Sequence, residues 1–197
     1  EMEESDWSSD VCSSDLGMHS ARILAEGWRS QVIAQRGPLA WKGLYTVVSL
    51  VGFGLIVRGF GQTRLAPQVL WATPVWTRHL ASLLVLLAMV LLAAAYVPRN
   101  GIKARLHHPM VLSVKLWALA HLLANNTLAD LLLFGSFLLW AVLDFRAARQ
   151  RDRAAGTVYP AGTLAGTGLT VVVGLAAWAG VAFWAHAWLF GVRPFGG

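Results

Sequence analysis

Apolar residues gather in five segments that are separated by short polar stretches. The segments are Gly43–Val57, Leu80–Val97, Met110–Ala124, Leu128–Leu143 and Leu169–Val192. A helix needs about 20 mostly apolar residues to cross a hydrocarbon core of about 30 Å. The second and fifth segments reach this length alone, and the first reaches it when Trp41 and Phe60 lie at the membrane interfaces. The pattern predicts an all-α fold, a polytopic transmembrane helical bundle with five visible spans.

The third and fourth segments are the shortest of the five, with 15 and 16 residues. The pair Asn125-Asn126 stands between them and is a turn signal. We therefore expect these two segments to form a tight helical hairpin.

The composition agrees with a membrane protein. Hydrophobic residues make up 56% of the chain and charged residues only 13%, about half of the 25% that is typical of soluble domains. High hydrophobicity also excludes a disordered chain.

Residues 1–16 differ in kind from the rest of the sequence. They hold six of the ten acidic residues, the single cysteine Cys12 and no basic residue, and they lack the pattern of a signal peptide. The string SDWSSDVCSSDL resembles translated sequencing-adapter sequence, and a disordered tail is the alternative.

We separate residues 1–16 from a membrane domain of residues 17–197. In that domain GMHSAR reads as the end of an overwritten helix, so the intact pattern would have six spans.

Basic residues are unevenly distributed between successive loops. Alternate loops hold 11 Lys and Arg residues on one side of the membrane and four on the other. Because cytoplasmic loops are enriched in basic residues, the richer set, which includes residues 144–159, is predicted to face the cytoplasm. The excess positive charge then faces anionic lipid, and we do not expect nucleic acid as a partner.

Several common catalytic motifs do not occur in the sequence. It contains no phosphate-binding loop of the G-x-x-x-x-G-K-[ST] type, no H-E-x-x-H zinc helix and no G-x-S-x-G nucleophile elbow. It also contains no internal repeat, a feature of many transporters. A small-solute transporter or channel is therefore a less favoured hypothesis, which we keep as the third behind the two given below.

Polar side chains inside apolar segments are costly and usually functional. His121, in WALAHLLANN, is the strongest candidate of this kind. Reflecting the hairpin about Asn125-Asn126 places His121 opposite Asp130. A carboxylate beside an imidazole is typical of a metal-ligating histidine, and a hydrogen bond that fastens the hairpin is an equal alternative.

The other candidates each have an alternative explanation. His79 begins an apolar segment, where an interfacial residue is the main alternative to a binding role. His107 and His108 start the hairpin and could present two basic groups to lipid headgroups. We expect His186 to be structural, and Lys115 to extend toward the cytoplasmic face in a lipid-facing or phosphate-binding role.

Six motifs together resemble the NnrU family of bacterial membrane proteins. They are GMHSAR, WKGLYTVVSLVGF, WTRHL, AAAYVP, IKARLHHPMVLSVKLWALAHLLAN and DRAAGTVYPAGTLAG, and the resemblance covers residues 17–197. It implies a multi-pass protein of the bacterial inner (cytoplasmic) membrane that is associated with denitrification, in clusters concerned with nitrite and nitric oxide reductases.

The same family includes plant zeta-carotene isomerase, a membrane enzyme that uses haem b to isomerise a cis double bond. Its histidine pattern is similar to His19, His79, His108 and His121 here, and its haem ligands match His19 and His121. The resemblance therefore implies haem b with His19 and His121 as metal ligands, and with His79 and His108 as further cofactor-binding candidates. Asp130 is added to these candidates from the hairpin geometry. The isomerase's alternate thiolate ligand has no counterpart, because Ala118 occupies the matching position.

The leading hypothesis is a haem-b protein that serves nitrite and nitric oxide reduction as an accessory or redox factor. Its expected partners are membrane lipid and a nitrogen-oxide reductase system. The alternative is a haem-dependent cis–trans isomerase that acts on a carotenoid or another apolar isoprenoid substrate. His121 lies thirteen residues beyond His108, about 20 Å along a helix. A ligand at the cytoplasmic end would therefore meet His121 only if the hairpin is shallow or tilted.

Overall fold

The structure is a computed structural model that describes residues 26–63 and 65–195, and in these ranges every regular element is a helix. The all-α prediction is confirmed. The chain divides into two compact units, Glu1–Pro67 and Gln68–Gly197, and each is described by itself. The expected N-terminal helix and His19 lie outside the described residues.

In the first unit, helix α3 spans Glu26–Thr63 and contains the whole predicted segment Gly43–Val57. The helix is interrupted at Gly37, where φ is +80°, a backbone conformation that glycine adopts without steric cost. Pro38 follows and cannot donate a backbone hydrogen bond to the preceding turn. The predicted span is therefore the straight part of a longer helix.

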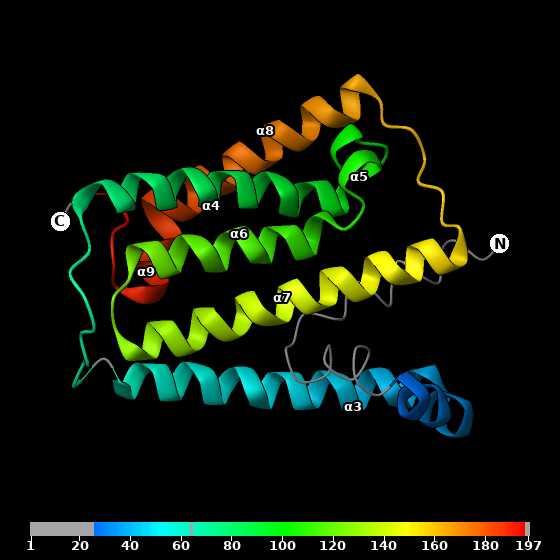
Figure 1. The fold of residues 1–197 in the computed structure, drawn as a ribbon, viewed down its shortest axis with the longest axis horizontal. Coiled ribbons are helices and arrows are strands. Elements are labelled where there is room, and N and C mark those ends of the chain that lie inside the picture. Colours follow the sequence, from blue (N-terminus) through cyan, green and yellow to red (C-terminus); the bar gives the residue numbers. More distant parts are fainter. Residues whose placement is uncertain (1–25, 64, 196–197) are drawn as a thin grey trace. The chain divides into compact units, whose positions relative to one another are not determined.

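Four helices of the second unit pack in the order α8, α4, α6, α7 (Figure 1). Helix α4 (Val75–Tyr96) contacts both α6 (Pro109–Ala124) and α8 (Leu164–Gly180), and α6 also contacts α7 (Leu128–Ala155). The short helix α5 (Gly101–Leu106) connects α4 to α6. One π-helical turn, η1 (Val181–Ala185), joins α8 to α9 (His186–Phe190).

Small side chains form the contacts between these helices. The alanines Ala88, Ala94, Ala118, Ala120 and Ala141 are at most 2% exposed. Large apolar side chains such as Leu132 and Val172 are instead more than 60% exposed. This inverted arrangement is typical of helices that pack closely through small residues while lipid covers their outer faces.

Three of the described helical stretches are long and apolar enough to cross a membrane. They are Val75–Tyr96, Leu128–Ala155 and Leu164–Phe190, and α6 is a shorter apolar helix. Together they support the predicted multi-pass membrane bundle. The fifth segment begins earlier than predicted because the Thr163 side chain accepts a hydrogen bond from the backbone of Gly166 and caps α8.

The predicted hairpin between α6 and α7 is confirmed, and its tip is attached to the segment that precedes α4. The backbone N–H of Leu70 donates to the carbonyl of Asn126 (2.8 Å), and that of Leu128 donates to Gln68 (2.9 Å). The Asn126 side chain also donates to the carbonyl of Trp71 (2.7 Å). These bonds hold one end of the α6–α7 pair.

The region 144–159, predicted as a loop, is mostly helical. Helix α7 continues to Ala155, and Gly156 ends it in the left-handed conformation with φ +60°. Alanine, arginine and glutamine favour helix, and Arg153 in the last turn complements the negative end of the helix dipole. The 28 residues of α7 extend for about 42 Å, longer than a hydrocarbon core of about 30 Å.

Candidate functional site

His121 lies in the last turn of α6, within an aromatic cluster. Its Nδ1 is 2.8 Å from the backbone carbonyl oxygen of Trp117. The imidazole stacks on the ring of Phe134 with 4.6 Å between centroids, and the Trp117 indole lies 4.9 Å away. Phe137 contacts the same indole edge-on at 5.4 Å. The imidazole is thus held by one hydrogen bond and by neighbouring rings.

Asp130 has partners other than His121 in the structure. Its Oδ2 accepts hydrogen bonds from the Thr127 hydroxyl (2.5 Å) and the Thr127 backbone N–H (3.2 Å), while the Thr127 hydroxyl caps the N–H of Asp130. This reciprocal capping box begins α7. The Asp130 carboxylate therefore caps its own helix, because the N–H and hydroxyl of Thr127 lie only three residues away. It is still near enough to His121 to act on the imidazole through its charge, so the hairpin geometry placed the two groups near one another but not in direct contact.

The other histidines expected to bind the cofactor do not gather around His121. The histidine whose charge acts on the His121 imidazole is His186, which the sequence analysis expected to be structural. His79 is exposed in the first part of α4. His108 stands at the opposite end of α6 from His121, about 20 Å away along the helix. His19, the second expected ligand, lies outside the described residues.

The fit of His121 to a haem iron depends on which ring nitrogen keeps a lone pair. A neutral imidazole carries its proton on one nitrogen only, and the hydrogen bond of the other ring nitrogen sets the tautomer. Since Nδ1 of His121 faces a carbonyl oxygen, which can only accept, Nδ1 carries the proton and Nε2 keeps the lone pair. In the part of the chain that the structure describes, no three His, Cys, Asp or Glu residues converge to hold a metal ion. A single imidazole fits axial ligation of haem better than a multidentate metal site.

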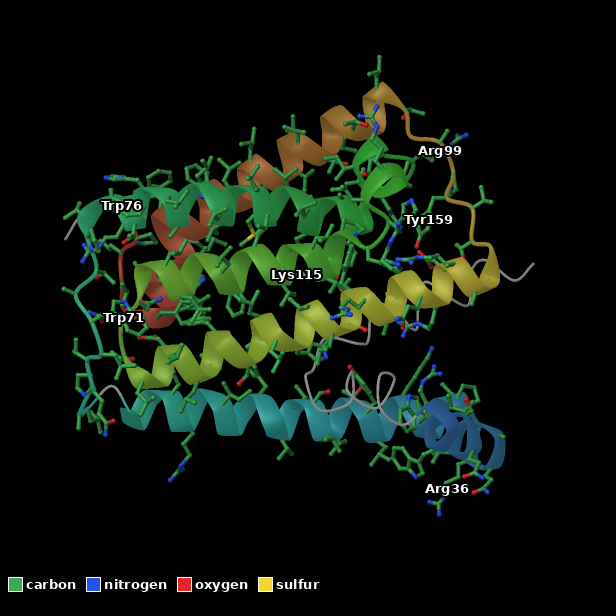
Figure 2. The ribbon with its side chains drawn as sticks, viewed as in Figure 1. Arg36, Trp71, Trp76, Arg99, Lys115 and Tyr159 are labelled. Atoms are coloured by element: carbon green, nitrogen blue, oxygen red, sulfur yellow. The ribbon has the colours of Figure 1, made fainter. Side chains whose placement is uncertain are left out.

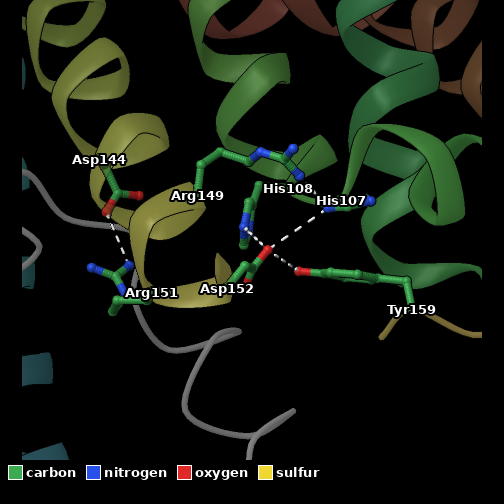
Figure 3. A network of polar contacts seen from close by, with 7 residues as sticks. All are labelled: His107, His108, Asp144, Arg149, Arg151, Asp152 and Tyr159. Carbon is green, nitrogen blue, oxygen red and sulfur yellow. Dashed lines mark hydrogen bonds and ion pairs between the residues drawn. The ribbon is translucent and has the colours of Figure 1, made fainter. Parts of the chain in front are cut away.

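A second group of polar side chains meets where α5 turns into α6 (Figure 3). We call it the corner network; it consists of His107, His108, Arg149, Asp152 and Tyr159. The Nε2–H of His108 donates to Oδ2 of Asp152 at 2.8 Å, and the Tyr159 hydroxyl donates to the same oxygen at 3.0 Å. The network thus ties the start of α6 to α7 and to the segment that follows α7.

His107 occupies a strained turn in this network. Its φ of +70° and ψ of −65° are rare for any residue except glycine. Its ring stacks on Tyr159 with centroids 4.2 Å apart, and the Arg149 guanidinium donates to its Nδ1. The same Nδ1 lies 3.8 Å from Oδ2 of Asp152. Such strain persists only where the surroundings fix it.

The charge state of His108 follows from its surroundings. Burial lowers the pKa of the His108 imidazole below its ordinary value of 6.5, although the Asp152 carboxylate acts in the opposite direction. Desolvation disfavours the charged imidazole. His108 is therefore a neutral donor to Asp152 at physiological pH.

The sequence interpretation recognised His108 but missed the residues around it. The sequence analysis did not single out Asp152, Arg149 or Tyr159. The available signal was a lone carboxylate among arginines, followed by Gly156 and an aromatic residue. Only the continuation of α7 brings these residues to the α5–α6 corner.

The apolar helices pack against one another through small residues and expose their large apolar side chains. These features define a multi-pass helical membrane protein. The chain belongs to the NnrU family, because the family model described as NnrU protein matches residues 13–194. No curated protein and no solved structure matches the chain.

Proposed function

We propose that this NnrU family protein binds haem b within the bacterial inner membrane, and that His121 would be one of the residues that hold it. The observation that carries the proposal is the hydrogen bond from Nδ1 of His121 to the carbonyl of Trp117. It fixes the tautomer in which Nε2 can bind iron, as in histidine ligands whose second nitrogen is held by a carbonyl group.

The rings around His121 suit an apolar macrocycle. Trp117, Phe134 and Phe137 form a contiguous aromatic cluster on α6 and α7, with ring centroids 5.2 to 5.4 Å apart. Trp117 and Phe134 contact the imidazole and orient it. Haem b, when bound, supplies one-electron redox chemistry, and the polarity and hydrogen bonding around its ligand adjust the reduction potential.

In cells, we propose a role in nitrite and nitric oxide reduction, as an accessory or redox factor for a nitrogen-oxide reductase system. The support is membership of the NnrU family together with the imidazole geometry. The alternative, isomerisation of an isoprenoid double bond, uses the same cofactor and the same His121 ligand. The two roles differ in what accumulates when the gene is deleted: nitrite or nitric oxide in the first, a cis isoprenoid in the second.

The direct test is the absorption spectrum of protein purified in detergent from haem-replete cells. We expect a Soret band, and an alkaline pyridine haemochrome spectrum of non-covalent haem b. Folded protein without haem would contradict both roles. Deletion of the gene under denitrifying conditions, followed by measurement of nitrite, nitric oxide and isoprenoid isomers, then separates the two.

A further inference from the structure

We propose that the seam between the first half of α6 and the C-terminal half of α7 binds the phosphate of an anionic phospholipid, with Lys115 and Arg149 as its charged ligands. The proposal is independent of haem, because His121 lies at the other end of α6.

Lys115 places a positive charge between the two helices. It lies six residues beyond Pro109 in an apolar helix, and Figure 2 shows it between α6 and α7. Its Nζ is 4.1 Å from the centroid of the Phe145 ring on α7. Among the described residues, no carboxylate lies within ion-pair distance of Lys115. The ring attracts the ammonium group but does not neutralise its charge.

Arg149 adds a second positive charge to the same face of α7. Phe145 and Arg149 are four residues apart, one helical turn, and therefore lie on one face. The Arg149 guanidinium donates to Nδ1 of His107. This hydrogen bond orients its charge, and among the described residues no carboxylate lies within ion-pair distance of Arg149; Oδ2 of Asp152 lies 3.8 Å from the same Nδ1 of His107.

Both acidic residues nearby have other partners. Asp152 receives the hydrogen bonds of His108 and Tyr159 on one oxygen. Asp144 lies 3.8 Å from the Arg151 guanidinium. In the described part of this seam, neither Lys115 nor Arg149 has a carboxylate within ion-pair distance.

The position of these cations along the helices favours a lipid phosphate as their anion. Helix α7 is about 12 Å longer than a hydrocarbon core and continues past the seam into the headgroup region. A lysine within an apolar helix is costly unless its charge reaches the interface or an anion. Basic pockets between membrane helices bind anionic headgroups. A phospholipid can supply the anion and also cover apolar surface. Its phosphate would contact Lys115 and Arg149, and its acyl chains would cover the exposed apolar side chains.

Native mass spectrometry of the full chain can test this in detergent micelles that contain equimolar phosphatidylglycerol and phosphatidylcholine. We expect the wild-type protein to retain phosphatidylglycerol in preference. Lys115→Leu and Arg149→Gln should each lower the ratio of the two lipids about fivefold, the contribution of one basic residue near an anionic surface. Lys115→Arg should preserve the preference, because it keeps the charge.

Arg153→Gln is the matched control, because it removes an exposed arginine of the same helix that lies outside the seam. An equal loss in Arg153→Gln and Arg149→Gln would overturn the proposal in favour of general charge attraction. Unchanged lipid ratios in folded Lys115→Leu protein would also overturn it, as would displacement of phosphatidylglycerol by excess inorganic phosphate. Circular dichroism and gel filtration establish the folding of each variant, and a haem spectrum of the same samples reports separately on the proposed function.

Discussion

Nε2 of His108 lies 2.8 Å from Oδ2 of Asp152, a carboxylate 44 residues further along the chain. Their side chains are only 21% and 16% exposed. This contact fixes the start of α6 to the C-terminal part of α7, and the hydrogen-bonded tip holds the other end of the pair. The imidazole–carboxylate contact that the hairpin geometry suggested for His121 thus exists at the opposite end of α6.

Asp152→Ala should destabilise the protein by about 1–3 kcal/mol, because it leaves the partly buried donors of His108 and Tyr159 without their acceptor. Tyr159→Phe should cost less, about 1 kcal/mol, since it removes the hydrogen bond from Tyr159 to Asp152 and leaves that of His108. Chemical unfolding in detergent measures both. Gln150→Ala changes an exposed position of the same helix and should have little effect. Equal stability of Asp152→Ala and Gln150→Ala would contradict a stabilising role for the corner network.

Stability should fall as the pH is lowered below about 6.5. Because burial lowers the pKa of His108 in the folded protein, the unfolded chain takes up a proton first as the pH falls through 6.5. Between the ordinary and the lowered pKa the unfolded state binds more protons, so the free energy of unfolding decreases with acidification. Unfolding curves across this pH range measure the slope. His108→Gln should flatten the slope near pH 6, and an unchanged slope would assign it to another group.

The helices of the second unit could largely be predicted from the sequence, because apolar run length and turn residues act locally. The Asn125-Asn126 turn ends α6 where the pattern placed it, and α4 ends at Tyr96, one residue before the predicted end at Val97. The end of α7 could not be predicted from hydropathy. A helix that leaves the membrane becomes polar without ceasing to be a helix, so residues 144–155 looked like a loop.

The site was harder to predict because hydrogen-bond partners depend on competition between nearby groups. Symmetry placed Asp130 opposite His121. The backbone N–H of Thr127, which has no partner within the helix, lies three residues from Asp130 and donates to its carboxylate. The His121 imidazole is hydrogen-bonded to the carbonyl oxygen of Trp117 on its own helix. The partners of His108 could not be inferred, since Asp152 is 44 residues away and its position depends on the length of α7.

His121→Ala should remove most of the haem from the purified protein, because it removes the proposed axial ligand. His186→Ala is the comparison variant, since Nδ1 of His186 also lies 2.8 Å from a backbone carbonyl, that of Val192, and its imidazole is near enough to His121 to act on it through its charge. The ratio of Soret to protein absorbance measures occupancy in both variants. We expect it to be unchanged in His186→Ala. Equal loss in both would show that His121 has no special role.

Asp130→Asn should affect stability more than haem occupancy, because the Asp130 carboxylate caps α7 instead of contacting His121. Loss of a capping interaction costs about 1 kcal/mol. Unfolding measurements and the haemochrome spectrum, recorded on the same preparation, separate the two effects. A tenfold or larger fall in haem affinity without destabilisation would instead indicate a direct contribution to the iron site.

The C-terminal end of α7 should face the cytoplasm, because it carries four arginines within eight residues. A reporter that is active only in the periplasm should be inactive when fused after Gly156 and active when inserted at the hairpin tip, next to Asn126. A cytoplasmic reporter at the same two positions should give the reverse result. Periplasmic activity after Gly156 would overturn the orientation.

Gly174→Ala should weaken the packing of α8 against α4. A Cβ at Gly174 would lie 2.5 Å from the Cα of Val90, a backbone atom that cannot rotate away. Inserting a methyl group into a tight contact costs about 1–3 kcal/mol. Gly168→Ala is the matched control in the same helix, because its Cβ would meet nothing within 4 Å. That variant should be neutral, or more stable by up to about 1 kcal/mol, since alanine favours helix over glycine. Unfolding of the two variants in one detergent gives the comparison, and a Gly174→Ala protein as stable as Gly168→Ala would mean that α4 and α8 are not in close contact.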